Sequence, residues 1–207
     1  MIDFWLIRHG ETVENVQGIC QGQTPGTLSE DGMMQAKALA GYLKNEEFDV
    51  IYSSDLRRTM KTTEEVLRFH PGEEIIPEPL LRERYLAGWQ GKPFPNNWDG
   101  MDLPEGAETS EDLIVRAEAF IKLIKEKNEG QKVFAMSHGG LIRAFWTVLH
   151  NLDPDSYYQW DTPKNTSISR FGLKEDGSVK ELVRNFAGHL GTVPVKNKAK
   201  NNNDWQL

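Results

Sequence analysis

The stretch that decides the fold is IDFWLIRHGET, residues 2–12. Residues 2–7 are mostly apolar, which is typical of a strand buried inside a sheet. The strand then ends on Arg8, His9 and Gly10, so a cation, an imidazole and a glycine stand at its carboxyl end. Ligands bind at that end of the strands in open α/β sheets. The stretch therefore predicts an α/β sheet with polar chemistry after its first strand.

A second strand with the same kind of ending strengthens this interpretation, because a lone histidine is usually structural. Residues 133–137 are mostly apolar and run into His138, Gly139 and Gly140, and a helical pattern follows. Between the two strands the chain supplies SSDLRRT at residues 53–59, after a third short strand. Two strands that end in this way favour a functional site over two isolated structural histidines.

Strands and helices alternate along most of the chain, which predicts a mainly parallel sheet covered on both faces, a three-layer α/β/α sandwich. We expect Ser29 to cap the first long helix, residues 53–55 to cap the second and Ser110 to cap the third. A hairpin is expected near the end, from its turn residues at 174–177. The expected strands are 2–7, 49–53, 74–77, 133–137, 167–173 and 179–186, and the expected helices are 30–43, 56–69, 111–128 and 140–149.

Two irregular segments are expected to border the site. Residues 13–29 are rich in glycine, glutamine and threonine and include Asn15, as loops that line a site often are. Residues 84–108 hold Trp89 and Trp98 and show no clear periodicity. A loop of this length in a compact domain is often functional, so we interpret it as a small cap; an ordinary surface loop is the alternative.

The length, net charge and cysteine count exclude several classes of protein. A length of 207 residues favours a single domain, expected at 1–195, with a flexible polar tail at 196–207. The net charge of −7 argues against a nucleic-acid partner, because no basic stripe is present to neutralise phosphates. No signal peptide and no membrane-spanning run are visible, which predicts a cytoplasmic protein. The single cysteine, Cys20, excludes an internal disulfide.

The polar residues suit a phosphate monoester, which carries close to two negative charges at neutral pH. Arg8 and one of the neighbours Arg57 and Arg58 would bind it through guanidinium groups, and the helix that opens at 139–140 would add backbone N–H groups. The candidate nucleophiles are His9 and His138, and from the residues alone their roles are interchangeable.

Four motifs carry a family resemblance: RHGET at 8–12, SSDLRRT at 53–59, LRE at 81–83 and SHGG at 137–140. In this order they resemble the histidine phosphatase superfamily, in its phosphoglycerate mutase-like group. The resemblance implies that His9 is the nucleophile and forms a phosphohistidine, that Arg58 rather than Arg57 faces the pocket, and that His138 holds the phosphoryl group as a hydrogen-bond donor.

The resemblance also implies the proton donor and the rest of the pocket. Glu83 would protonate the leaving group and later activate water, with Glu11 and Glu108 as rivals. A surface ion-pair cluster of Glu83 with Arg82 and Arg84 is the alternative without catalysis. No cofactor or metal is expected, because the other histidines lie outside the motifs. The residues expected to bind phosphate or substrate are Arg8, Asn15, Gln21, Gly22, Arg58, His138 and Gly139.

Within the family the chain resembles phosphatases more than mutases. The mutases carry a longer insertion after the acid, with a paired arginine for the substrate carboxylate, whereas between Trp89 and Glu108 the only basic residue is Lys92. A smaller cap makes hydrolysis easier. We expect hydrolysis of a small phosphate monoester, in the class of sugar phosphates, phosphoglycerate or ribazole phosphate. A phosphoglycerate mutase is the alternative, and a non-catalytic phosphate-binding protein is less favoured.

Overall fold

The computed structural model describes residues 1–95 and 103–192 and contains one six-stranded sheet. The strand order is β3-β2-β4-β1-β5-β6. The first four strands in this order run parallel, and β5 and β6 are antiparallel additions that form the predicted hairpin. The strands are β1 Ile2–Arg8, β2 Val50–Ser53, β3 Ile75–Pro77, β4 Lys132–Ser137, β5 Ile168–Leu173 and β6 Val179–Phe186.

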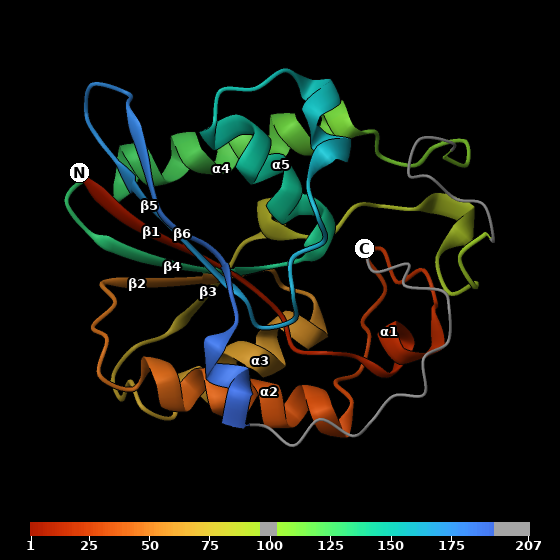
Figure 1. The fold of residues 1–207 in the computed structure, drawn as a ribbon, viewed down its shortest axis with the longest axis horizontal. Coiled ribbons are helices and arrows are strands. Elements are labelled where there is room, and N and C mark those ends of the chain that lie inside the picture. Colours follow the sequence, from red (N-terminus) through yellow and green to blue (C-terminus); the bar gives the residue numbers. More distant parts are fainter. Residues whose placement is uncertain (96–102, 193–207) are drawn as a thin grey trace.

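Helices cover both faces of the sheet, which confirms the three-layer α/β/α architecture (Figure 1). Along β1, Phe4 packs into an apolar cluster with α4 and α5, while its neighbour Trp5 packs into a second cluster with α2. Alternate side chains of one strand therefore bind opposite helical layers. The helices are α1 Val13–Gln17, α2 Glu30–Leu43, α3 Arg57–Leu67, α4 Ser110–Lys127 and α5 Gly139–Leu149.

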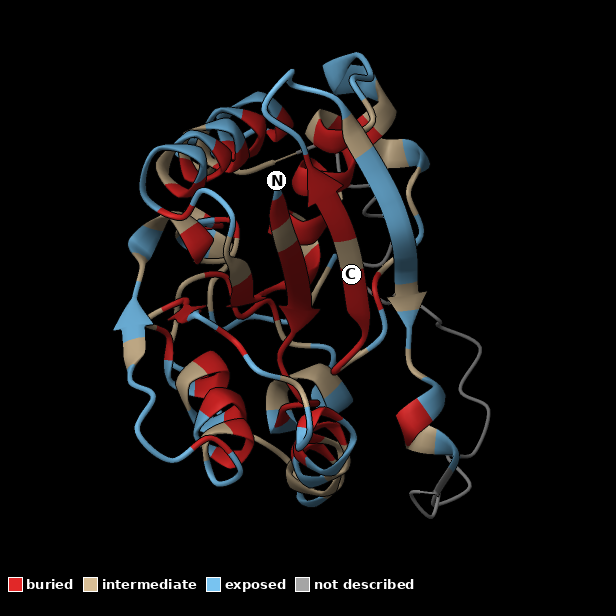
Figure 2. Cartoon of the chain, turned by 90° about the vertical axis from the view of Figure 1, so that its left-hand side faces the viewer, coloured by how far each residue is buried: buried red, intermediate tan, exposed pale blue. Residues whose placement is uncertain are grey.

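The edges of the sheet are more exposed than its centre, as Figure 2 shows. β1 and β4 are almost wholly buried, whereas every residue of the edge strand β6 is at least partly exposed. Within the described residues no helix is long and apolar enough to cross a membrane.

One predicted cap is confirmed and two are wrong. Ser29 caps α2, since its Oγ accepts a hydrogen bond from the Gly32 N–H at 2.9 Å. α3 begins after Leu56 without a side-chain cap, because Ser54 and Asp55 contact other partners, described below. The N-cap of α4 is Thr109, one residue before the predicted Ser110.

The loop predicted at 13–29 contains a short helix that we did not expect, α1. Thr12 and Asn15 form its capping box, each accepting a hydrogen bond from the backbone N–H of the other. The T-x-x-N spacing is the signal that sequence reasoning missed. Asn15, predicted to bind phosphate, thus has its Oδ1 engaged in the cap.

The start of the predicted cap segment is bound to this same loop. Cys20 donates its N–H to the carbonyl of Lys92, and Gly91 donates to the carbonyl of Cys20, both at 2.8 Å. A 3-10 helix at Ala87–Trp89 lies just before these bonds. Residues 96–102, with Trp98, lie outside the described residues, as does the predicted tail at 196–207. The boundaries of the predicted domain and cap stay a prediction.

Candidate active site

The site lies at the carboxyl ends of β1 and β4, where the parallel register places Arg8 opposite Ser137. The residues that follow, His9 and His138, therefore meet at one edge of the sheet. Their ring centroids are 5.1 Å apart. A pocket of about 140 Å³ opens beside His9 and is lined by residues of α1 and of the segment after Glu83.

His9 is buried, and its ring is fixed by its own loop. Nδ1 lies 2.7 Å from the carbonyl oxygen of Gly10, which only accepts hydrogen bonds, so Nδ1 carries the proton. Nε2 is then left with a lone pair. Burial, together with the positive charges of Arg58 and Arg8, holds the pKa of His9 well below its usual value. His9 is therefore a neutral imidazole whose Nε2 lone pair accepts a hydrogen bond from Arg58 Nε at 3.3 Å.

His138 is fully buried and lies beside Arg58 rather than on the pocket wall. Its Nδ1 accepts a hydrogen bond from Arg58 Nε at 3.1 Å, and its Nε2 lies 2.8 Å from Ser54 Oγ. Since Nδ1 accepts, Nε2 carries the proton and donates it to Ser54. Burial and the charge of Arg58 hold the pKa of His138 well below its usual value. Ser54, expected to cap α3, instead orients this histidine.

Arg58 connects the two histidines to the loop after α1. Its Nε also lies 3.3 Å from His9 Nε2, and its two terminal nitrogens donate to the carbonyls of Gly22 and Thr24 at 2.8 and 2.7 Å. Arg58 is buried, whereas Arg57 is exposed. The structure thus places in the pocket the arginine that the resemblance selects.

Arg8 supplies the second buried cation of the pocket. One terminal nitrogen donates to the carbonyl of Pro163, and Nε is buried without a hydrogen-bond partner in the described part of the chain. Burial lowers the pKa of both Arg8 and Arg58 to about 10, so both remain charged at neutral pH. Two fixed cations beside His9 form an anion site.

Glu83 points into the same pocket, held by two backbone N–H groups. Oε1 accepts from Arg84 at 2.8 Å and Oε2 from Gly140 at 3.1 Å. A Cβ on Gly140 would lie 2.4 Å from Oε1, so a larger residue at this position would displace the carboxylate. The N–H of Gly140, expected to bind phosphate, thus holds the carboxylate instead. Gly139 is buried outside the pocket lining.

The surface ion-pair interpretation of Glu83 does not match the contacts. Arg82 pairs with Asp55, with Nε 2.6 Å from Oδ1, and Arg84 lies over the ring of Tyr157. Of the rival acids, Glu108 pairs with Arg116 away from the pocket. Glu11 does line the pocket, where it accepts a hydrogen bond from Ser29 Oγ at 3.0 Å. Glu11 therefore remains a rival to Glu83.

The comparisons with known proteins agree with this geometry. The family described as the histidine phosphatase superfamily (branch 1) matches residues 4–185. The chain belongs to this superfamily. It is 33% identical over 156 residues to a metal-independent phosphoserine phosphatase of Arabidopsis thaliana, covering 68% of this chain and 66% of that protein.

Two further similarities extend over nearly the whole chain. Phosphoserine phosphatase 1 of Hydrogenobacter thermophilus is 30% identical, with 95% of this chain and 98% of that protein covered. Among solved structures, phosphoserine phosphatase from Entamoeba histolytica in complex with phosphoserine superposes with a TM-score of 0.80 at 26% identity. That match covers 92% of this chain and 100% of the other.

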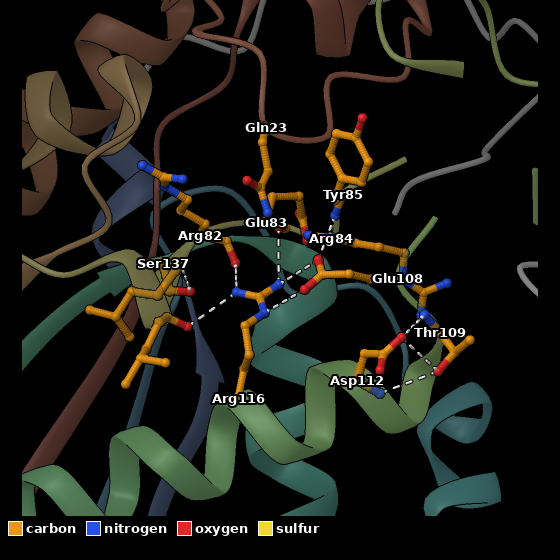
Figure 3. A network of polar contacts seen from close by, with 12 residues as sticks. Gln23, Arg82, Glu83, Arg84, Tyr85, Glu108, Thr109, Asp112, Arg116 and Ser137 are labelled. Carbon is orange, nitrogen blue, oxygen red and sulfur yellow. Dashed lines mark hydrogen bonds and ion pairs between the residues drawn. The ribbon is translucent and has the colours of Figure 1, made fainter. Parts of the chain in front are cut away.

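In this histidine phosphatase an arginine that sequence reasoning missed holds the acid in place. Arg116 of α4 donates to the backbone carbonyls of Arg82 and Glu83, at 2.7 and 3.1 Å, and pairs with Glu108 at 2.8 Å (Figure 3). Glu108 in turn accepts a hydrogen bond from the backbone N–H of Tyr85. The Arg116 side chain thus connects α4 both to the backbone just before the cap segment and to Glu108 at its end.

The remaining predicted binding residues, Asn15, Gln21 and Gly22, all line the pocket of the histidine phosphatase. Within the described residues no group of three or more histidine, cysteine, aspartate or glutamate side chains is placed to hold a metal. Sequence reasoning also missed pocket-lining residues that belong to no motif. Their positions depend on how the chain after residue 83 packs in three dimensions. These are Arg84, Arg143, Tyr157, Tyr158 and Asn165.

Proposed function

We propose that this histidine phosphatase hydrolyses a small phosphate monoester through a phosphohistidine on His9. The observation that carries the proposal is the state of His9, a neutral imidazole whose Nε2 lone pair lies beside two buried guanidinium groups. Arg8 and Arg58 offset the phosphate charge that would repel a nucleophile. We expect a cytoplasmic enzyme that acts on a small phosphorylated metabolite.

The reaction proceeds in two steps. In the first, Nε2 of His9 forms a bond to phosphorus as the ester P–O bond breaks, and Glu83 gives a proton to the departing oxygen. In the second, Glu83 takes a proton from water, whose oxygen attacks phosphorus and breaks the P–N bond. Phosphate leaves, and His9 and Glu83 return to their initial states. His138 keeps Arg58 in place through the Nδ1 hydrogen bond.

The relatives' printed names support a phosphatase. They include two phosphoserine phosphatases, and the Entamoeba histolytica enzyme has also been solved with 3-phosphoglyceric acid. The pocket of about 140 Å³ is small, which suits substrates of this size.

The test is phosphate release from a panel of phosphate monoesters, with phosphoglycerate isomerisation measured in parallel. We expect release without isomerisation. Isomerisation with little release would instead make the protein a mutase. Absence of both, with the protein folded and phosphate bound, would favour the non-catalytic alternative.

A further inference from the structure

One wall of the pocket carries two arginines that the proposed reaction does not use. Arg84 follows the acid and is only 4% exposed, and Arg143 lies in the first turns of α5. Both line the pocket. Their guanidinium carbons lie over the ring of Tyr157, at 5.0 and 4.5 Å from its centroid. Two cations are therefore gathered around one aromatic ring.

Arg143 differs from the arginines that stabilise the fold. Arg82, Arg116 and Arg170 each pair with a carboxylate. Among the described residues Arg143 has no ion pair, and its Nε is buried without a hydrogen-bond partner. An aromatic ring attracts a cation but leaves the guanidinium N–H groups without strong acceptors. Since buried donors without acceptors are costly, this side chain is suited to a ligand that brings an acceptor.

The two arginines lie on the side of the pocket that the leaving group would occupy. Arg84 donates its backbone N–H to Glu83, and a Cβ built on Gly140 would contact both Glu83 and the hydroxyl of Tyr157. In the proposed reaction Glu83 contacts the leaving-group oxygen, whereas Arg8 and Arg58 hold the phosphoryl group. The Tyr157 wall therefore faces the part of the substrate beyond the ester oxygen.

We propose that Arg84 and Arg143 form a second anion site that binds a carboxylate on the leaving group. The inference rests on the proposed phosphatase function and narrows it to substrates with an ester phosphate and a carboxylate in one small molecule. A guanidinium fork matches the geometry of a carboxylate. A second phosphate fits less well, because Glu11 and Glu14 also line the pocket and would repel a dianion.

The test compares substrates that differ only at the carboxylate. The pairs are 3-phosphoglycerate with glycerol 3-phosphate, and phosphoserine with phosphoethanolamine. We expect kcat/KM to be at least about 10-fold higher for the carboxylated member of each pair, mainly through KM. Arg143→Gln should reduce that preference by roughly 10-fold.

A matched control is Arg184→Gln, which removes an arginine that lies over Trp160 at 4.8 Å, outside the pocket. It should keep the preference. Arg143→Lys retains the charge without the fork and should keep part of the preference, which provides a second variant if Arg143→Gln does not fold.

The outcomes separate this inference from the proposed function. No phosphate release from any ester, nitrophenyl phosphate included, would overturn the phosphatase itself. Release at equal kcat/KM from both members of each pair would overturn the carboxylate site alone. An equal loss on both members in Arg143→Gln would show that Arg143 only supports packing.

Discussion

The hydrogen bond at one ring nitrogen of His9 determines that the other nitrogen is the reactive one. Because Nδ1 is committed to the Gly10 carbonyl, Nε2 faces Arg58 and the pocket as a lone pair. Burial and two neighbouring cations then keep the ring neutral. The orientation and the protonation state of the proposed nucleophile thus both follow from contacts within the fold, before any substrate binds.

Replacing His9 tests this role directly. We expect His9→Ala to lower kcat by about 1,000-fold or more and to abolish the acid-labile phosphoenzyme, because among the described residues no other histidine lines the pocket. The measurement is rapid quenching with a radiolabelled substrate. His150→Ala is the matched control, since His150 pairs with Glu181 at the far end of α5. If His9→Ala formed as much radiolabelled phosphoenzyme as the wild type, the nucleophile would be another residue.

At the residue scale, motif residues could be read from the sequence but their partners could not. His9, Arg58 and Glu83 were identifiable from four short motifs, and the structure gathers them at one pocket. That Arg58 binds two histidines, or that Gly140 holds Glu83, depends on segments far apart in the chain. No local pattern marks Arg143 as a lining residue, because its neighbour Tyr157 comes from a later 3-10 helix, Pro154–Gln159.

The helix α2 approaches the loop after β1 so closely that one glycine is required. A Cβ on Gly32 would lie 1.8 Å from the carbonyl oxygen of Glu11. We expect Gly32→Ala to destabilise the protein by about 2 kcal/mol or more and to lower kcat, since the backbone next to His9 must move. Gly41→Ala, in the same helix with nothing within 4 Å, should instead stabilise by about 0.5–1 kcal/mol. Urea denaturation of both variants measures this difference, and equal effects would refute the steric argument.

The hydrogen bonds from Arg116 of α4 to the backbone at Glu83 predict that this arginine affects kcat. Arg116→Met removes the donor to the carbonyls of Arg82 and Glu83 and leaves Glu108 without its ion pair. We expect kcat to fall by about 10-fold or more through loss of position at Glu83, with KM for substrate less affected. Lys122→Met, on an exposed site of the same helix, should change neither. A normal kcat in Arg116→Met would mean that the acid is held without α4.

At the scale of elements, apolar periodicity predicted every strand of the described sheet, with each boundary shifted by at most one residue. Capping was less predictable, because a serine before a helix has competing partners. Ser54 contacts His138, so α3 begins without it, and Thr109 replaces Ser110 through a capping box with Asp112. The short helix α1 was too small to produce a periodic signal.

For the whole molecule, buried histidines predict a loss of stability in acid. Burial lowers the pKa of His189 to about 4, below the 6.5 of the unfolded chain. Below pH 6.5 the unfolded chain therefore binds a proton that the folded one does not, so the free energy of unfolding decreases as pH falls from 6.5 toward 4. His9 and His138 act in the same direction.

His189→Gln should lessen this dependence. Between pH 7.5 and 5.5 we expect the variant to lose about 1 kcal/mol less stability than the wild type. Urea denaturation at both pH values gives the difference, with each protein referred to its own stability at pH 7.5. If the two proteins lost the same stability between these pH values, the pKa of His189 would be the same in the folded and unfolded states.

The central position of β1 has a consequence for how the enzyme is made. Trp5 pairs with Phe134 on one side and with Arg170 on the other, so both neighbours of the first strand are translated long after it. A nascent chain leaving the ribosome must carry this apolar strand without its first neighbour until residue 137 has emerged, and without its second until residue 173 has emerged. Such distant pairings form slowly and expose surface to aggregation and to chaperones. The two histidines also cannot meet until residue 138 has emerged, so the growing polypeptide cannot carry out the proposed reaction until most of it has been synthesised.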